Sequence, residues 1–268
     1  MSTRTARTSP LTARERRDAA LKTRRRRHGI LTVGVLAVVA FMITVAIVVQ
    51  SKRAADERPL VAPAGATGEE KLLVTVGRAD APAVLTVYED PRCPGCAHIE
   101  RLLHDTINRL QDEGKLRVDY HLLSFVDRIA PGRGSKYAAN ALAAAQDAGK
   151  FREYHDVLYA HPPKAENVDT YGDKKVLLDL ARKVPGLSTA SFTAAVKDGT
   201  HDTWIAAIQK AFDRQTLIQG TPALVFKGRD LLKDPEHALT PERLTELVDN
   251  EATPPQAPSR AGAAPDEG

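Results

Sequence analysis

The chain has 268 residues, of which 43% are hydrophobic and 27% charged, which is enough for one folded domain of ordinary size with extensions. The formal net charge of +4 is unevenly distributed along the chain. Residues 1–29 hold ten Arg or Lys against two acidic residues, a net charge of +8, so the remaining residues carry a net charge of −4. A mildly acidic folded part excludes a nucleic-acid-binding protein whose affinity rests on a basic surface.

The first 49 residues divide into two segments. Residues 1–29 are polar and rich in Arg, Thr and Ser, with no apolar face, and we expect a disordered basic tail. Residues 30–49 contain no charged side chain, and twenty residues of helix span a hydrocarbon core of about 30 Å. Four arginines at 24–27 precede this segment, so the positive-inside rule places the tail in the cytoplasm.

We therefore predict a single-pass signal anchor at 30–49 in the cell membrane, with the rest of the chain extracytoplasmic. A cleaved signal peptide is the alternative, but its apolar core is about 7 to 15 residues long and ends at small residues. Here Ser51, Lys52 and Arg53 follow a longer run. Both interpretations export the domain. Residues 50–69, which include several prolines and glycines, are predicted to be a linker.

A folded domain is expected from residue 70 to residue 250. Residues 72–76 form its first predicted strand. Residues 83–88 form a second, apolar and β-branched strand that ends in the turn residues 89–92. The next four residues are Cys93, Pro94, Gly95 and Cys96. The apolar residues after them are spaced to share one helix face: Ile99, Leu102, Leu103, Ile107 and Leu110.

The only two cysteines of the chain thus lie where a strand turns into a helix. The first turn of a helix has unpaired backbone N–H groups and about half a positive charge, which favours a thiolate at Cys93. Pro94 suits that turn, because its missing N–H costs no intrahelical hydrogen bond there. The Cys-x-x-Cys spacing lets Cys96 reach Cys93, so the pair can open and close locally. The pattern predicts redox chemistry, with Cys93 the exposed nucleophile and Cys96 the resolving thiol.

Two other roles for the cysteines compete with redox chemistry. A structural disulfide that closes so short a loop would restrain the unfolded chain little. A zinc site needs two more ligands, and the nearby candidates are His98 and His104. On a helix, His98 lies about 200° around the axis from Cys96, so the ligands do not converge. We assign no metal and no organic cofactor to this site.

The middle of the chain is predicted to be helical. Residues 116–123 alternate as a strand and complete a βαβ unit, and a helical insertion follows from about 133 to 219. Its helices are predicted at 135–148, 151–160, 174–184, 189–196 and 200–217. Its rings are expected to pack in the core or face solvent, and none is assigned to the site: Tyr137, Tyr154, Tyr159, His155, His161, His201 and Trp204.

A Gly-Thr-Pro sequence at 220–222 breaks the last helix of the insertion. Residues 223–226 are predicted to be a strand, 227–230 a hairpin turn and 231–232 a returning strand. Thr240 as N-cap and Pro241 as first helical residue predict a final amphipathic helix. Residues 251–268, rich in Pro, Ala and Gly, are expected to be disordered.

The order of these features resembles the DsbA-like thiol:disulfide oxidoreductases of the thioredoxin superfamily. The motif Cys93-Pro94-Gly95-Cys96 between strand and helix and the distant Thr221-Pro222 carry the resemblance. It implies an α/β thioredoxin fold with an inserted helical subdomain, preceded here by one transmembrane helix. It also implies that the peptide bond before Pro222 is cis and that Thr221 faces the cysteine pair across a groove that binds substrate.

The chain departs from this family pattern at two positions. Thioredoxins and the best-known oxidases carry a buried acid six residues before the first cysteine, and here that residue is Val87, with Glu89 and Asp90 nearby. The well-studied oxidases have His after Pro between the cysteines, and here that residue is Gly95. Loss of an imidazole that stabilises the thiolate predicts a less oxidising pair.

We therefore expect an extracytoplasmic oxidoreductase that acts as a disulfide oxidase on exported, cysteine-containing proteins. The resemblance implies that a membrane redox partner reoxidises the pair. A reductase or isomerase that uses the same site is one alternative. A non-catalytic binding or metal-delivery module is the other.

Overall fold

The computed structural model describes residues 37, 39–47 and 59–252. Residues 37 and 39–47 are helical, and residues from Pro59 onward belong to a separate compact unit. Among the described residues, no helix combines the length and the apolar content that crossing a membrane requires. The predicted tail at 1–29, about half of the predicted anchor at 30–49 and nearly all of the predicted C-terminal tail lie outside the described residues.

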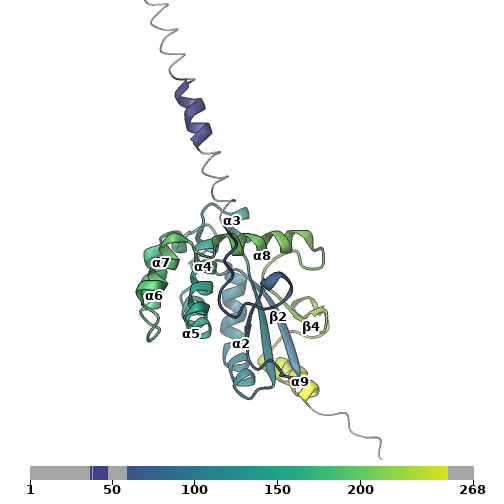
Figure 1. Cartoon of the computed structure of the whole chain (residues 1–268). Helices are drawn as coiled ribbons and strands as arrows, with labels where there is room; N and C mark the ends of the chain where they lie inside the picture. The colour runs from purple at the N-terminus through teal and green to yellow at the C-terminus, as the bar shows by residue number, and fades with distance from the viewer. Residues whose placement is uncertain (1–36, 38, 48–58, 253–268) are drawn as a thin grey trace, which may run out of the picture. The chain divides into compact units, whose positions relative to one another are not determined.

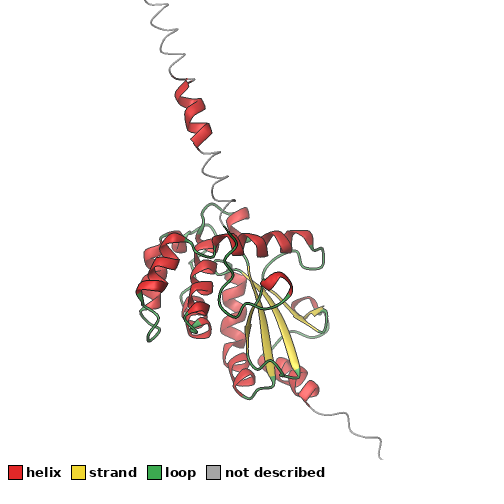
Figure 2. Cartoon of the chain, viewed as in Figure 1, coloured by secondary structure: helices red, strands yellow, loops and turns green. Residues whose placement is uncertain are grey.

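Five strands of the described domain form one sheet in the order β1-β3-β2-β4-β5 (Figure 2). The strands are β1 (Val74–Val76), β2 (Ala83–Glu89), β3 (Leu116–Leu122), β4 (Ala223–Phe226) and β5 (Arg229–Asp230). Strands β2 and β3 are parallel, and every other pair is antiparallel. Helix α2 (Pro94–Asp112) connects the parallel pair, so the predicted βαβ unit is confirmed.

The two faces of β2 point toward different helices. Alternate residues of a strand face opposite sides, and in β2 the fully buried set ends at Glu89. Glu89 contacts His155 of α5 (Phe151–Ala160), and α5 in turn packs against α2. Tyr88 points the other way and packs against Phe212 of α8 (Asp202–Arg214), with ring centroids 5.9 Å apart. The end of β2 therefore meets the helical insertion on both of its faces.

The helical insertion lies between β3 and β4. Its other helices are α3 (Val126–Ile129), α4 (Gly134–Asp147), α6 (Lys174–Ala181) and α7 (Ala190–Asp198). The alanine-rich α4 is central, because its small buried side chains allow α5, α7 and α8 to pack closely around it. Figure 1 shows α4, α5, α6 and α7 grouped on one side of α2, with α9 (Pro241–Ala252) near one end of the strands.

The hairpin after β4 differs from its prediction. Its turn contains only Lys227 and Gly228, both with positive φ (50° and 76°), and the returning strand is β5 rather than residues 231–232. The carboxylate of Asp230 accepts a hydrogen bond from the N–H of Leu232, which starts a 3-10 helix at Leu231–Lys233. A local side-chain hydrogen bond thus ends the strand early.

Part of the predicted linker lies against the domain instead of standing apart from it. The carbonyl oxygens of Pro59 and Val61 accept hydrogen bonds from Thr203 and His201, at 2.9 and 2.8 Å. The N–H of Ala64 donates to Asp147, at 2.6 Å. These partners lie in and beside α8 and at the end of α4, so their backbone and side-chain bonds hold residues 59–64 on the insertion.

The predicted core face of α8 is confirmed. Trp204, Ile205 and Ile208 are fully buried, and Phe212 is nearly so. The indole N–H of Trp204 donates to the carbonyl oxygen of Lys71, at 2.7 Å. The one tryptophan of the chain therefore packs in the core and fixes the segment that precedes β1.

Candidate active site

The two cysteines lie at the N-terminus of α2, directly after the turn that ends β2. Cys93 is the N-cap residue with extended backbone angles (φ −71°, ψ 119°), and Pro94 is the first helical residue. The peptide bond between Thr221 and Pro222 is cis. The thiol of Cys93 donates to the carbonyl oxygen of Thr221, with Sγ and O 3.4 Å apart. The structure thus brings together the two sequence motifs, which are 128 residues apart.

Gly95 makes the close approach of these two motifs possible. A Cβ atom placed on Gly95 would lie 3.0 Å from Cδ of Pro222 and 3.6 Å from Sγ of Cys93. The first of these distances is tighter than ordinary carbon contacts, so the proline ring occupies the space that a side chain at this position would need. Gly95 and Pro222 therefore pack directly against each other.

The two thiols have opposite acidities. The pKa of Cys93 is lowered to about 6, mainly by a hydrogen bond from the thiol of Cys96. Burial acts against this shift, and the backbone N–H of Cys96 and the side chain of Thr221 add to it. Burial, reinforced by the nearby Cys93 sulfur, raises the pKa of Cys96 well above its usual value. The N–H of Asp90 donates to Sγ of Cys96, at 3.4 Å. At neutral pH the first sulfur is a thiolate and the second is a thiol.

Cys93 is less accessible than the sequence predicts. The residue is only 5% exposed, and it packs in a small apolar cluster with Cys96, Ala97, Val126 and Tyr159. Val126 and Tyr159 belong to the helical insertion, which covers the cysteine pair from one side. The insertion therefore restricts the directions from which another sulfur can reach Cys93.

Tyr159 was assigned to packing, and the structure shows that it packs against the cysteines themselves. It is 3% exposed, and its hydroxyl has no hydrogen-bond partner among the described residues. Its ring also contacts His155, with centroids 4.6 Å apart. The spacing of α5 predicts a buried face that includes Tyr159, but only the tertiary fold shows which residues that face meets.

The residue before the cysteines fixes the active-site turn to the insertion. The Arg92 side chain is fully buried and forms ion pairs with Asp127, at 2.7 Å, and with Asp169, at 3.4 Å. Its guanidinium also donates to the carbonyl oxygens of Pro131 and Glu166. The backbone N–H of Arg92 donates to Asp90, at 2.7 Å. Each of these bonds limits how far Cys93 can move.

Asp90 is a buried acid in the same turn. Burial raises the pKa of its carboxyl group to about 7, although hydrogen bonds from the N–H groups of Val126 and Arg92 favour the carboxylate. In the sequence, only its position near the cysteines distinguishes Asp90. The structure shows that it joins the turn before the cysteines to the start of α3.

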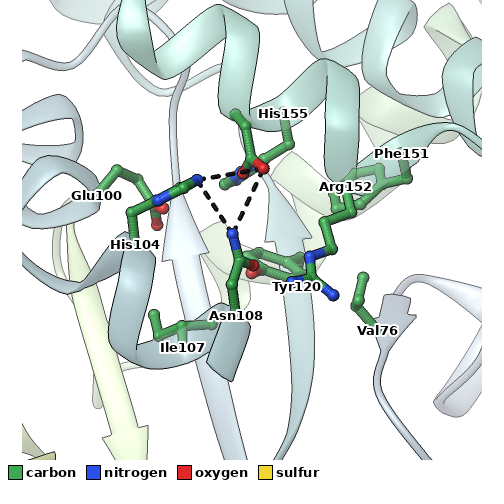
Figure 3. Close-up of a pocket in the computed structure, with 10 residues that line it drawn as sticks. Val76, Glu100, His104, Ile107, Asn108, Tyr120, Phe151, Arg152 and His155 are labelled. Atoms are coloured by element: carbon green, nitrogen blue, oxygen red, sulfur yellow. Dashed lines mark hydrogen bonds and ion pairs between the residues drawn. The ribbon is translucent and has the colours of Figure 1, made fainter. Parts of the chain in front are cut away.

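A second group of buried titratable side chains lies behind the cysteine pair. Nε2 of His155 is 3.0 and 3.1 Å from the two carboxylate oxygens of Glu89. Burial disfavours the charged imidazole, but the carboxylates of Glu89 and Glu100 outweigh burial and raise the pKa of His155 well above its usual value. The charge of Glu89 in turn raises the pKa of Cys96. Figure 3 shows Glu100 and His155 on two helices around a small cavity.

The buried acid of β2 is Glu89, two positions after Val87. Both residues face the same side of β2, because they are two positions apart in one strand. Glu89 is 1% exposed, and it lies one pleat closer to the cysteines than Val87 does. Strand periodicity could have identified Glu89, since it places the residue on the core face. The pairing with His155 could not be predicted, because no spacing relates residues 66 positions apart.

Three other histidines form their closest polar contacts outside the cysteine pair. His161 lies near the surface and bonds the carbonyl oxygen of Val157 in its own helix, at 2.8 Å. His201 is buried, but its partners are Val61, in the segment 59–64 that lies on the insertion, and Asp147 at the end of α4. His104 pairs with Asp105 and Asp156 and lines the small cavity next to Glu100 and His155.

Several solved structures resemble this chain in fold. DsbA from Mycobacterium tuberculosis, in its oxidised form, is 22% identical with a TM-score of 0.57, and the match covers 68% of this chain and 94% of that one. MdbA from Actinomyces oris, a thiol-disulfide oxidoreductase, is 25% identical with a TM-score of 0.56, covering 67% and 88%. BdbD from Bacillus subtilis is 19% identical with a TM-score of 0.56, covering 72% and 98%.

A comparison with curated protein sequences gave no match. The family comparison did give one: the model of a family described as Thioredoxin matches residues 70–250. That match includes all five strands of the sheet, the cysteine pair and the loop with the cis proline. With its mixed α/β sheet, its inserted helices and this match over most of its length, the chain belongs to the thioredoxin family.

Proposed function

We propose that this protein is an extracytoplasmic thiol:disulfide oxidoreductase that forms disulfides in exported proteins through the Cys93 and Cys96 pair. The observation that carries the proposal is the difference between the two thiols. Cys93 has a pKa of about 6 at a helix N-terminus, whereas Cys96 is buried with a raised pKa. One stable thiolate beside one protonated thiol is the arrangement that thiol–disulfide exchange needs. The resemblance to a thiol-disulfide oxidoreductase of 25% identity supports it.

The oxidation of a client consists of two exchanges. In the first, a client thiolate attacks Sγ of Cys93 in the closed disulfide; the Cys93–Cys96 bond breaks, and Cys96 leaves as a thiolate that takes up a proton. In the second, another client thiolate attacks the client sulfur of the mixed disulfide, and Cys93 leaves as a thiolate. Two electrons pass from the client to the pair, which ends reduced. A membrane redox partner would then accept these electrons.

The low pKa of Cys93 favours the oxidising direction. A stabilised thiolate is a good leaving group in the second exchange, and it stabilises the reduced pair relative to the disulfide. Gly95 does not add to this stabilisation of the thiolate, because it has no imidazole, unlike the histidine at this position in the well-studied oxidases. The Cys96 thiol, the backbone N–H groups of Cys96 and Gly95 and the Thr221 side chain lower the pKa of Cys93 without an imidazole.

We further propose that Thr221 and Pro222 bind the client backbone beside the cysteines. The carbonyl oxygen of Thr221 already lies 3.4 Å from Cys93 Sγ. A proline has no backbone N–H to donate, so the sheet hydrogen bonds of β4 do not extend to Pro222. Hydrogen bonds between the backbone of Thr221 and an extended client segment would hold a client sulfur in line with Cys93.

The reduction potential of the purified full-length protein tests this function. Equilibration with glutathione, with alkylation to report each thiol, is expected to give a potential nearer to about −120 mV, the value of a strong oxidant, than to that of a reductase. A potential close to about −270 mV would assign a reductase instead. The Cys93→Ser variant should lose all oxidation of a reduced client protein. Retention of its cellular function by that variant would favour a non-catalytic binding module.

We also propose that residues 30–49 anchor the protein in the cell membrane, with the basic tail in the cytoplasm. The support is the uncharged run of twenty residues and the arginines at 24–27 before it. Protease added to intact spheroplasts should digest the domain and leave an N-terminal tag protected. Replacement of the four arginines by glutamate should weaken or invert that topology. Protection of the domain in intact spheroplasts would exclude this orientation.

A further inference from the structure

We propose that Glu89, Glu100 and His155 form a binding site for a divalent metal ion of the zinc type, separate from the cysteine pair. Each residue offers one ligand atom, a carboxylate oxygen or an imidazole nitrogen, and all three atoms lie within 4.8 Å of one another. The residues are 1%, 7% and 3% exposed. They come from β2, α2 and α5, so three packed elements hold the ligand set in place.

Glu100 is the member of this group whose burial needs an explanation. Glu89 and His155 satisfy one another through the bonds of 3.0 and 3.1 Å. The carboxylate of Glu100 accepts no hydrogen bond within residues 59–252, and in Figure 3 no dashed line reaches it. The imidazoles of His155 and His104 stabilise its charge only through space, and burying a carboxylate that accepts no hydrogen bond costs free energy. A cation bound between the three side chains would supply the missing partner.

The donor set selects the kind of ion. One imidazole nitrogen and two carboxylate oxygens are ligands that zinc accepts, with three protein ligands leaving a fourth position for water. Glu100 and His155 also line a cavity of about 10 Å³ together with Tyr120 and Phe151. That volume is close to the space that one water molecule needs. Calcium takes six to eight oxygen ligands, which this site does not offer.

The charge of the site also matches a divalent ion. Two carboxylates and a neutral imidazole sum to −2, which one such ion balances. Carboxylate and imidazole ligands must be deprotonated to bind a metal ion, so binding at this site would release protons.

A path from solvent to the site is present. A surface groove of about 230 Å³ is lined by Glu100, His104, Asp156 and Tyr159, among others. Glu100, His104 and Asp156 also line the inner cavity, so they form the boundary between groove and cavity. Nε2 of His104 lies 3.2 Å from Asp156 at this boundary, and Figure 3 shows a dashed line between His104 and Asn108. Rotation of these half-exposed side chains would open the site.

Zinc binding to the full-length protein tests this proposal. The Cys93→Ser/Cys96→Ser double variant is used as background, because free thiolates bind zinc themselves. Isothermal titration with zinc chloride is expected to show one bound equivalent. Glu100→Gln in this background should weaken binding at least tenfold, since it replaces a ligand by an isosteric neutral group. His237→Ala on an exposed loop is the control and should bind as the background does.

X-ray absorption at the zinc edge of the background protein gives a second readout that needs no folding-sensitive variant. The expected first shell contains only nitrogen and oxygen, and includes one imidazole. Equal binding by Glu100→Gln and its background, less than one equivalent bound, or a first shell without imidazole would overturn the proposal. Because the background has no thiols, these outcomes do not depend on the proposed oxidoreductase function.

Discussion

The guanidinium of Arg92 lies 2.7 Å from the carboxylate of Asp127 and is itself completely buried. Asp127 at the same time accepts hydrogen bonds from the N–H groups of Ser135 and Lys136, in the first turn of α4. One ion pair thus connects the residue before Cys93, the short helix α3 and the start of the central helix of the insertion. The position of the active-site turn depends on the insertion through this contact.

Replacement of Arg92 by methionine is expected to lower the free energy of unfolding by about 3 kcal/mol. The change leaves Asp127 and Asp169 without their buried cationic partner, and breaking a buried pair on one side costs far more than breaking an exposed one. Urea denaturation followed by circular dichroism measures the loss. Arg78→Met is the matched control, because the Arg78 pair with Asp80 lies in solvent. Equal losses in the two variants would contradict the role assigned to Arg92.

Gly95→Ala tests the packing of the active-site turn against Pro222. The added methyl group would lie 3.0 Å from the proline ring, so either the ring or the turn must move by a few tenths of an ångström. Overpacking of this kind should cost about 1 kcal/mol of stability and slow the oxidation of a reduced client protein. Gly220→Ala, in open space two residues before Pro222, should change neither quantity. Unchanged client oxidation in Gly95→Ala would show that the contact does not matter.

The elements around the cysteines could be predicted from local patterns. Alternation identified β2, and apolar spacing identified α2, because both periodicities are properties of neighbouring residues. The motif of two cysteines at a strand-to-helix junction is a local pattern as well, whereas the role of Thr221 and Pro222 follows only from the resemblance to a known family. Local patterns also identified Trp204 as a core residue, since it shares a face with Ile205 and Ile208.

The contacts that complete the site depend on tertiary packing, which the sequence does not display. In the sequence, nothing distinguishes Arg92 from a surface residue of a turn. Its partners Asp127 and Asp169 reach it only in the folded domain. In the sequence, His155 is one of several histidines without a common spacing. Only the packing of α5 brings it within hydrogen-bond distance of Glu89. The insertion also buries Cys93, which a local pattern would leave exposed. Docking of residues 59–64 was missed for the same reason, since a segment with prolines and glycines has no periodicity that predicts where it binds.

Tyr159→Phe is expected to raise the free energy of unfolding by about 1 kcal/mol. The hydroxyl of Tyr159 is buried beside the cysteines and has no partner in the described domain, so its removal ends an uncompensated desolvation. Tyr154→Phe on the same helix is the matched control. Its hydroxyl donates to the carbonyl oxygen of Leu177, at 2.8 Å, and its loss should lower stability by about 1 kcal/mol. Effects of the same sign in both variants would be evidence against a hydroxyl without a partner at Tyr159.

The rate at which Cys93 reacts with iodoacetamide should rise with pH through a single midpoint close to pH 6. Only the thiolate reacts, and the pKa of Cys93 is lowered to about 6 by its hydrogen bonds. Cys96 should not contribute below pH 9, because burial raises its pKa. Thr221→Val should move the midpoint upward, since the Thr221 side chain contributes to the lowered pKa. A midpoint near about 8.5, the value of a free thiol, would remove the basis of the proposed chemistry.

The lowered pKa of Cys93 also makes the stability of the reduced protein depend on pH. The folded, reduced protein releases the Cys93 proton near pH 6, whereas the unfolded chain keeps it until about pH 8.5. The unfolded state therefore binds more protons between these values, and the stability of the reduced protein must rise with pH across this window. The contribution is complete above the unfolded pKa and is lost as the pH falls through 6. Urea denaturation of the reduced protein, compared with Cys93→Ser at each pH, should show this difference, and parallel pH profiles for the two proteins would contradict it.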